Sequence, residues 1–287
     1  VTAVQDILAR INSEYPSLSK GQKKIADYIK KNYDKAAFMT AQKLSTASGT
    51  SESTVVRFAA VLGYEGYPQF QQKLQEMIRN KLTSLQRMEV AFSRIGSGDI
   101  VENVMNGDLE NIKSTIDGID KTAFDGAVNA LIKARTIYVL GIRTSSALAG
   151  FLAFYLKLMF DNVKLMSASG TSEIYEEMLP LSGEDAMLII SYPRYSKRAV
   201  SAAEYACVKG CCVIALTDCE ASPINKFATY SLTAKSEMAF FADSFAAPFS
   251  LAGALIVALG FKKKNTLYDN LEKLEKLWDE YQVYEKN

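Results

Sequence analysis

The run MTAQKLSTASGTSESTVVRFAAVLGYEGYPQF, residues 39–70, decides how the first part of the chain folds. Thr40 precedes the helical segment AQKLSTAS and Gly49 follows it, which is typical of an N-cap and of a left-handed glycine that ends a helix. Ser51 then precedes a second segment, ESTVVRFAAVL, which stops before Gly63. Two short helices joined by a tight glycine turn predict a helix-turn-helix.

The second of these helices has two distinct sides. Its apolar residues recur with helical spacing and are expected to face a core: Val55, Phe58, Ala59 and Leu62. Short hydroxyls and an arginine at the front of a helix can reach phosphates and base edges in the major groove of DNA. The candidate DNA contacts are Thr40, Ser51, Ser53, Thr54 and Arg57, and Arg57 is the best candidate for a bidentate guanine contact. The spacing alone leaves open a plain helical hairpin with a capping serine and a surface arginine.

Helical patterns flank this motif. Ser19 precedes an amphipathic segment rich in lysine, and Tyr64, Tyr67 and Phe70 are interpreted as packing residues of the chain after the motif. Residues 68–95 predict a long helix that ends at the Gly-Ser-Gly of 96–98, and a further helix runs from Ile100 to about Ile119. These segments are expected to connect two domains and to contribute to dimer contacts.

From Lys121 onward short apolar strands alternate with helices. The strands are predicted at 136–141, 162–166, 186–191 and 211–217, and helices at 145–160 and 197–209. Strands that are apolar on both faces and separated by helices predict a doubly wound parallel sheet, so the fold class is α/β after an all-α domain. An amphipathic helix with Leu267, Leu271, Leu274, Trp278 and Tyr281 on one side ends the chain, and it docks on its own domain or across a dimer.

Two strand ends carry groups suited to an anion. The first strand is followed by Gly141, Arg143, Ser145 and Ser146, and the third by Ser191, Arg194 and Ser196. Ligands sit at the carboxyl ends of strands in such sheets, where helix N-termini offer free backbone N–H groups. Two arginines nearby fit a phosphate or a carboxylate. The pattern leaves open that the serines are helix caps and the arginines ordinary surface residues.

Composition narrows the possible chemistry. Residues 1–90 hold 13 Lys and Arg against 8 Asp and Glu, so a basic part precedes a mildly acidic remainder, which suits a polyanion-binding module joined to another domain. The chain has no histidine, which excludes Ser-His-Asp triads, Cys-His pairs and histidine bases. The four cysteines, at 207, 211, 212 and 219, lack zinc-site spacing and are interpreted as buried structural thiols. Neither a metal nor a cofactor is predicted.

The same features bear on location. The first residues do not resemble a signal peptide, and no stretch reaches the roughly 18 charge-free apolar residues of a membrane span. The longest candidate, 240–261, is interrupted by Asp243 and Pro248 and is interpreted as a buried core segment. A reduced, cytoplasmic protein without membrane contact is therefore predicted.

The quoted run closely resembles the N-terminal domain of the RpiR/MurR family of bacterial regulators. The matching features include Gly49 and Ser51 at the turn, Thr54-Val55 with Arg57-Phe58, and Leu62-Gly63-Tyr64. Residues 121–260 resemble the sugar isomerase (SIS) domain that follows in this family, through the strand-glycine-helix around Ser145, Ser191 at its strand end, and ALTD at 215–218. That resemblance implies a phosphosugar-binding role for Ser145, Ser146, Ser191 and Ser196, and a pocket position for Glu237.

The chain also departs from that pattern. The usual second loop reads serine-any-serine-glycine, whereas SYPRYS at 191–196 places Pro193 and Arg194 there, and Arg143 occupies a common glycine position. The departures favour a small anionic ligand in general over any particular sugar phosphate.

Together these observations predict three regions: a helix-turn-helix domain over 1–80, a helical connector over 81–120 and a SIS-type domain over 121–287. The predicted function is a homo-oligomeric transcription regulator of sugar or amino-sugar metabolism that binds palindromic double-stranded DNA and responds to a phosphorylated or acidic sugar. One alternative is a phosphosugar isomerase with an accessory helical domain, although no clear acid-base pair accompanies the serine loops. Another is a metabolite-binding module whose N-terminal helices contact protein.

Overall fold

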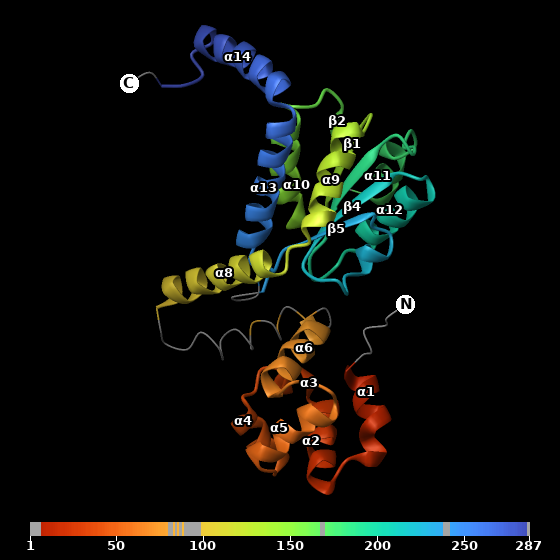
Figure 1. Cartoon of the computed structure of the whole chain (residues 1–287), viewed down its shortest axis with the longest axis vertical. Coiled ribbons are helices and arrows are strands. Elements are labelled where there is room, and N and C mark those ends of the chain that lie inside the picture. The colour runs from red at the N-terminus through yellow and green to blue at the C-terminus, as the bar shows by residue number, and fades with distance from the viewer. Residues whose placement is uncertain are drawn as a thin grey trace. The chain divides into compact units, whose positions relative to one another are not determined.

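The computed structural model describes residues 7–79, 83, 85, 88, 99–166, 170–237 and 242–285. They form two compact units, one built almost entirely by the chain up to Ile100 and the other by the chain from Val101 onward (Figure 1). The predicted helix over 68–95 is present as far as Arg79. Most of its second half and the Gly-Ser-Gly of 96–98 lie outside the described residues.

The first unit is helical. Its elements are α1 (Ile7–Glu14), the 3-10 turn η1 (Tyr15–Ser17), α2 (Lys20–Lys31), α3 (Tyr33–Ala36), α4 (Ala41–Ser48), α5 (Glu52–Val61) and α6 (Tyr67–Arg79). Ser19 begins α2 with a capping box, because its side chain accepts from the Gln22 amide while Gln22 accepts from the Ser19 amide. The predicted core residues of α5 are fully buried, together with Ile25, Ile29 and Phe70 from other helices.

The second unit is an α/β domain. Its elements are α8 (Ile100–Asp117), α9 (Lys121–Lys133), β1 (Ile137–Gly141), α10 (Ser145–Leu156), β2 (Val163–Leu165), α11 (Thr171–Glu177), β3 (Ala186–Ile190), α12 (Lys197–Val208), β4 (Cys212–Thr217), the 3-10 turn η2 (Pro223–Lys226), β5 (Tyr230–Thr233), α13 (Ala246–Lys262) and α14 (Lys264–Glu280). The domain thus has the predicted alternation of strands and helices.

The strands form one parallel sheet in the order β2-β1-β3-β4-β5. The chain moves outward from β1 to β2 and then returns to the other side of β1 to form β3, so the strand order reverses between β1 and β3. Gly141 at the end of β1 pairs with Ile190 at the end of β3. A parallel sheet with such a reversal has a crevice at the carboxyl ends of the two strands that flank it.

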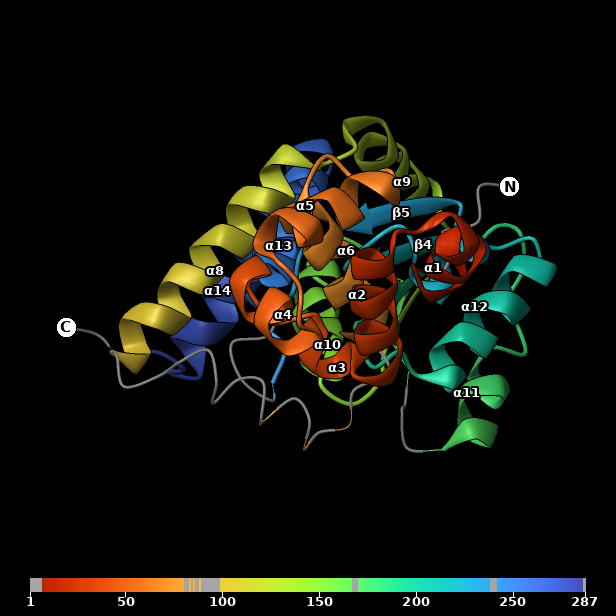
Figure 2. The same ribbon diagram turned by 90° about the horizontal axis from the view of Figure 1, so that it is seen from below.

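Helices cover both faces of this sheet. Residues of α9, α10 and α13 share one apolar core with the sheet, and residues of α11 and α12 share the other. Figures 1 and 2 show these two groups of helices on opposite sides of the strands. The prediction of a doubly wound parallel sheet, preceded by an all-α helix-turn-helix domain, is therefore confirmed.

The sheet has one strand, β5, that was not predicted from the sequence. β5 pairs with β4 at the edge of the sheet, and its segment YSLT lacks the continuous apolar run of a strand that is buried on both faces. The helix predicted over 145–160 ends earlier, at Leu156, and the predicted strand over 162–166 is reduced to Val163–Leu165.

Helix α8 packs on the second unit with its polar side. The Asn111 side chain bonds the backbone of Glu237, the Thr115 hydroxyl accepts from the Lys235 amide, and Asp108 accepts from the Ser244 hydroxyl. Ile112 of α8 also packs on the core of the domain, whereas Val101, Met105, Leu109 and Ile116 are exposed. The domain boundaries predicted from the sequence remain a prediction, although α8 is bonded to the domain that follows it.

The last helix leaves the body of its domain. α13 and α14 meet at an angle of 98°, and α14 has no buried residue (Figure 1). Its base is attached to the domain, since Leu267 packs on the core and the Asn270 side chain donates to the Leu158 carbonyl at 3.0 Å. Of the two predicted arrangements, docking on its own domain is therefore observed for the first turns of the helix.

Two further predictions concern membrane-spanning helices and the burial of the cysteines. Among the described helices, no single one is long and apolar enough to cross a membrane, and α13 with α14 meets that criterion only as a bent pair. Cys211 is buried, as predicted, whereas Cys212 and Cys219 are only half-buried and Cys207 is exposed on α12. The burial prediction is wrong for Cys207 because α12 turns only its alanine face, including Ala203 and Ala206, to the sheet.

Candidate functional site

The turn of the helix-turn-helix is built as its residues predict. The Thr40 hydroxyl accepts from the Lys43 amide at 3.2 Å and so caps α4. Gly49 ends α4 with φ at 64°, and the Thr50 amide donates to the Ser45 carbonyl at 2.8 Å. This left-handed conformation is easily adopted by glycine, and it lets the chain turn directly into α5.

The front of α5 presents a cluster of hydroxyls. Ser51 occupies the N-cap position, but its side chain makes no capping bond; Oγ lies 2.8 Å from Thr54 Oγ1 and 3.0 Å from Ser53 Oγ. Ser51 therefore precedes the helix without capping it through its side chain, so it is not the capping serine of the plain helical hairpin. Arg57 donates from Nε to the Ser53 carbonyl at 3.1 Å, one turn back. The cluster is exposed apart from the half-buried Thr54, and it leaves hydroxyl and guanidinium groups at the start of the helix.

Helix α6 packs on the helix-turn-helix and is hydrogen-bonded to Met39, the residue that precedes it. Tyr67 donates its hydroxyl to the Met39 carbonyl at 2.6 Å, and Gln71 donates its side-chain amide to the same oxygen at 2.8 Å. Burial raises the pKa of Tyr67, so this phenol stays protonated and keeps donating. Phe70 is in edge contact with Phe58 and Tyr64. These contacts confirm that the aromatic residues after the motif pack the domain.

In the second unit the first candidate loop connects β1 to α10. A Cβ on Gly141 would overlap the Ser145 carbonyl and lie 2.9 Å from Ala149 Cβ, so only glycine allows the helix to begin this close to the strand. Arg143 follows with φ at 59°, a left-handed conformation that is unfavourable for arginine. The Ser146 hydroxyl donates to the Arg143 carbonyl at 2.6 Å, while Ser145 is buried and Arg143 is exposed.

The second loop begins with a buried serine that has an unused hydroxyl. Ser191 is 3% exposed, and its Oγ has no hydrogen-bond partner among the described residues. Its backbone is fully engaged, because the amide donates to the Leu216 carbonyl and the carbonyl accepts from Thr217 Oγ1 at 2.7 Å. Leaving a hydroxyl buried without a partner costs about 1–3 kcal/mol. A ligand with an acceptor oxygen would remove that cost.

The rest of this loop reaches β4. Tyr195 donates its hydroxyl to Asp218 Oδ1 at 2.7 Å, and burial together with the Asp218 carboxylate raises the pKa of Tyr195. Thr217 Oγ1 also lies 2.7 Å from Ser222 Oγ. Tyr195, Thr217 and Asp218 were not among the predicted ligand residues. The available signal was the position of Thr217 and Asp218 at the end of the fourth strand, next to the strand that ends in Ser191.

The structure brings together most of the predicted ligand residues, but not all. The loops of Gly141 to Ser146 and of Ser191 to Ser196 lie at the carboxyl ends of adjacent strands, on either side of the reversal in strand order. Arg194 is exposed and Ser196 begins α12 without a side-chain capping bond. Glu237 follows β5, two strands away from β3, and is exposed with its backbone bonded to Asn111. It does not join the two loops within the chain.

The groups at these two strand ends are of the kind that suit an anion. Two helices, α10 and α12, begin there on opposite faces of the sheet, and their N-terminal amides attract negative charge. Arg143 and Arg194 add positive charge, and Ser191 adds a free hydroxyl. No group of three His, Cys, Asp or Glu residues suited to a metal ion occurs among the described residues.

Two family models match the chain. The helix-turn-helix domain of the rpiR family matches residues 5–81, and the SIS domain matches residues 130–258. The protein is thus a transcription regulator that joins a helix-turn-helix to an α/β domain of the SIS type. The chain belongs to the rpiR family of helix-turn-helix regulators, as its recognition motif and serine loops predicted.

The chain is similar to proteins that are named as HTH-type transcriptional regulators. The chain is 26% identical over 231 residues to an uncharacterised HTH-type transcriptional regulator of Haemophilus influenzae, covering 79% of each. It is 26% identical over 238 residues to the HTH-type transcriptional regulator HexR of Escherichia coli, covering 79% of this chain and 77% of HexR. These named regulators point away from an enzyme.

Solved structures support the fold. The Vibrio vulnificus NanR protein complexed with ManNAc-6P has a TM-score of 0.60 at 24% identity, covering 96% of this chain and 98% of NanR. The sugar isomerase domain of an RpiR transcription factor from Sphaerobacter thermophilus has a TM-score of 0.58 at 24% identity, covering 60% of this chain and 96% of that domain.

Proposed function

We propose that this regulator controls genes of sugar or amino-sugar metabolism and that a phosphosugar or other small anionic metabolite, bound between its two serine loops, changes its affinity for DNA. The buried Ser191 hydroxyl carries the proposal, because it is a hydrogen-bond donor without a partner among the described residues, at the reversal of the strand order. The sugar phosphate in the NanR structure supports an effector of this class.

The DNA contacts are assigned to Thr40, Ser51, Ser53, Thr54 and Arg57. They stand at the front of α5 or at the start of α4, where a helix-turn-helix meets the major groove. A palindromic operator requires two such heads, so the regulator acts as a homo-oligomer. Its partners are double-stranded DNA and a small anionic sugar.

An isomerase is the less favoured alternative. Proton transfer on a sugar phosphate needs a positioned acid and base. Neither loop contains a carboxylate or a histidine, and the nearby Asp218 accepts the Tyr195 hydroxyl.

Fluorescence anisotropy tests the proposal. The purified chain is titrated onto DNA from upstream of its own gene and onto a scrambled duplex, at several salt concentrations and with a panel of phosphosugars and sugar acids. We expect salt-sensitive preference for the native duplex and a change of affinity with one class of compound. Equal, weak binding of both duplexes with no response to any compound would overturn the proposal.

A serine variant locates the effector site. Ser191→Ala removes only a hydroxyl, so we expect it to abolish the metabolite response while DNA affinity stays unchanged. Ser250→Ala is the matched control, because Ser250 bonds within α13, to the Ala246 carbonyl, and is not part of either loop. A full response in Ser191→Ala would remove this loop from the effector site.

A further inference from the structure

Helix α5 turns a surface of mixed chemistry to solvent. Its buried side is formed by Val55, Phe58 and Ala59. The opposite side, called the outer face here, consists of four exposed residues at intervals of three and four positions: Ser53, Val56, Arg57 and Ala60. Two of these side chains are polar and two are apolar, so hydrogen bonding alone does not describe what this face can recognise.

The surroundings of the outer face leave Val56 open. Arg57 folds back over the first turn, where Nε donates to the Ser53 carbonyl at 3.1 Å and Nη2 to Ser53 Oγ at 3.4 Å. On the flank of Thr54, helix α2 packs closely, because a Cβ on Gly21 would lie 3.2 Å from Thr54 Cγ2. Val56 is nevertheless 45% exposed. Its methyl groups therefore form an apolar spot beside the serine and the arginine.

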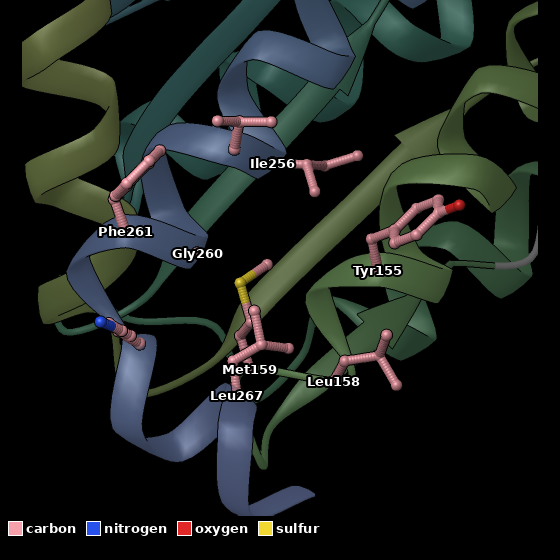
Figure 3. A pocket seen from close by; sticks show the side chains of 9 residues that line it. Tyr155, Leu158, Met159, Ile256, Gly260, Phe261 and Leu267 are labelled. Atoms are coloured by element: carbon pink, nitrogen blue, oxygen red, sulfur yellow. The ribbon is translucent and has the colours of Figure 1, made fainter. Parts of the chain in front are cut away.

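This spot differs from an apolar surface of the kind that packs on protein. In the second unit, side chains such as Tyr155 of α10 and Phe261 of α13 gather around a pocket of about 350 Å³ that is lined almost wholly by carbon (Figure 3). Extended apolar surfaces of that kind mark contacts with other apolar surfaces. Val56 is a single β-branched side chain between Ser53 and Arg57, which suits a small apolar group that is itself surrounded by polar ones.

The major groove of DNA offers one such group. Among the four bases, only thymine presents an apolar substituent there, its 5-methyl group, next to hydrogen-bonding edges. Glu52 stands one turn before Val56 and is exposed, and its carboxylate is repelled by phosphates. The side of α5 that carries Val56 is thus better suited to a base edge than to the DNA backbone.

We infer that Val56 contacts the 5-methyl group of a thymine in the operator, beside the base assigned to Arg57. This contact contributes to the preference for operator sequence through apolar packing and not through a hydrogen bond. The inference rests on the proposed function, because it requires α5 to lie in the major groove. It adds one residue to the DNA contacts and one base to the sequence that they recognise.

Uracil substitution tests the contact directly. Uracil pairs as thymine does but lacks the 5-methyl group, so a duplex made with deoxyuridine at every thymidine position removes the methyl groups of an operator whose exact sequence is unknown. Fluorescence anisotropy measures the affinity of wild type and of Val56→Ala for the native and the uracil duplex. We expect the wild type to lose about fourfold in affinity for each methyl group that Val56 contacts. The loss in Val56→Ala should be smaller by that factor, and the difference between the two losses isolates the contact.

Val61→Ala is the matched control. Val61 is also 45% exposed and belongs to the same helix, but it is the last residue of α5, whereas the N-terminal residues of a recognition helix contact the bases. We expect Val61→Ala to respond to uracil as the wild type does. Circular dichroism verifies that both alanine variants are folded.

The possible failures can be told apart. If the wild type prefers the native to the scrambled duplex, but uracil weakens the wild type and Val56→Ala by the same factor, the inference is overturned and the proposed function stands. If the wild type does not distinguish the native from the scrambled duplex, the proposed function is overturned and the inference with it.

Discussion

At the scale of single residues, Gly141 decides whether the first ligand loop can form. We expect Gly141→Ala to lower the melting temperature and to weaken effector binding, because its Cβ would overlap the Ser145 carbonyl. Backbone must move to relieve that overlap, with a cost of about 1–3 kcal/mol. Gly150→Ala is the control within α10, since a Cβ there meets nothing within 4 Å. It should stabilise the domain by up to about 1 kcal/mol. Equal melting temperatures for both variants would contradict the close approach.

Arg57 is the residue on which DNA specificity depends in the proposed function. If it reads a base, Arg57→Ala should cost about 1–3 kcal/mol on operator DNA and little on scrambled DNA. Arg57→Lys separates charge from geometry, because lysine keeps the attraction to phosphate but cannot make the bidentate contact. We therefore expect the lysine variant to lose discrimination between the two duplexes while retaining affinity for both. Anisotropy on each duplex measures this, and wild-type discrimination by Arg57→Lys would reduce Arg57 to a backbone contact.

At the scale of elements, an ion pair joins the amino ends of β1 and β3. The candidate ligand loops lie at the opposite, carboxyl ends of these strands. Arg135, just before β1, donates to both carboxylate oxygens of Asp185, at 3.0 and 2.7 Å, just before β3. Burial works to raise the pKa of Asp185, but bonds from Arg135 and Ser182 outweigh it and lower the pKa. The pair is therefore fully formed near neutral pH, above the ordinary Asp pKa of about 3.9.

The stability of the α/β domain should consequently fall with acid. A lowered pKa in the folded state means that the contribution of Asp185 is present above its unfolded pKa and is lost as pH falls through the folded value. We expect Asp185→Asn to be less stable than wild type by about 1–3 kcal/mol at neutral pH, with the difference shrinking below about pH 4. Thermal melts across this range measure it. A difference that stays constant with pH would show that the charge of Asp185 is not what fastens the strands.

Some of the strands and loops could be predicted from the sequence, and others could not. The four strands with continuous apolar runs could be predicted, because a strand that is buried on both faces is apolar along its length. Their positions also located the two candidate ligand loops, one that begins at Gly141 and one that ends at Ser196. β5 could not, since an edge strand such as YSLT is defined by its pairing with β4. The bond from Tyr195 to Asp218 was equally hidden, because it joins loops of two strands whose adjacency only the sheet order determines. The exposure of Cys207 depended likewise on which side α12 turns to the sheet.

At the scale of the whole molecule, the proposed function gives DNA binding to one unit and effector binding to the other, and any coupling between the two sites must be reciprocal. If an effector changes operator affinity by some factor, operator DNA must change effector affinity by the same factor, which for regulators is typically about 5- to 150-fold. The effector must then bind differently to the DNA-bound and free states, since a ligand with equal affinity for both shifts nothing.

This reciprocity gives the last prediction. We expect effector titrations with and without saturating operator to differ by the factor found in the DNA titrations, in the same direction. Ser191→Ala tests the route, because it should remove the coupling while leaving operator affinity at its effector-free value. Arg57→Ala should instead lower operator affinity and leave effector affinity in the absence of DNA unchanged. If Arg57→Ala altered effector affinity without DNA, the two units would not be the separate binding modules that their residues indicate, and the assignment of tasks to them would have to change.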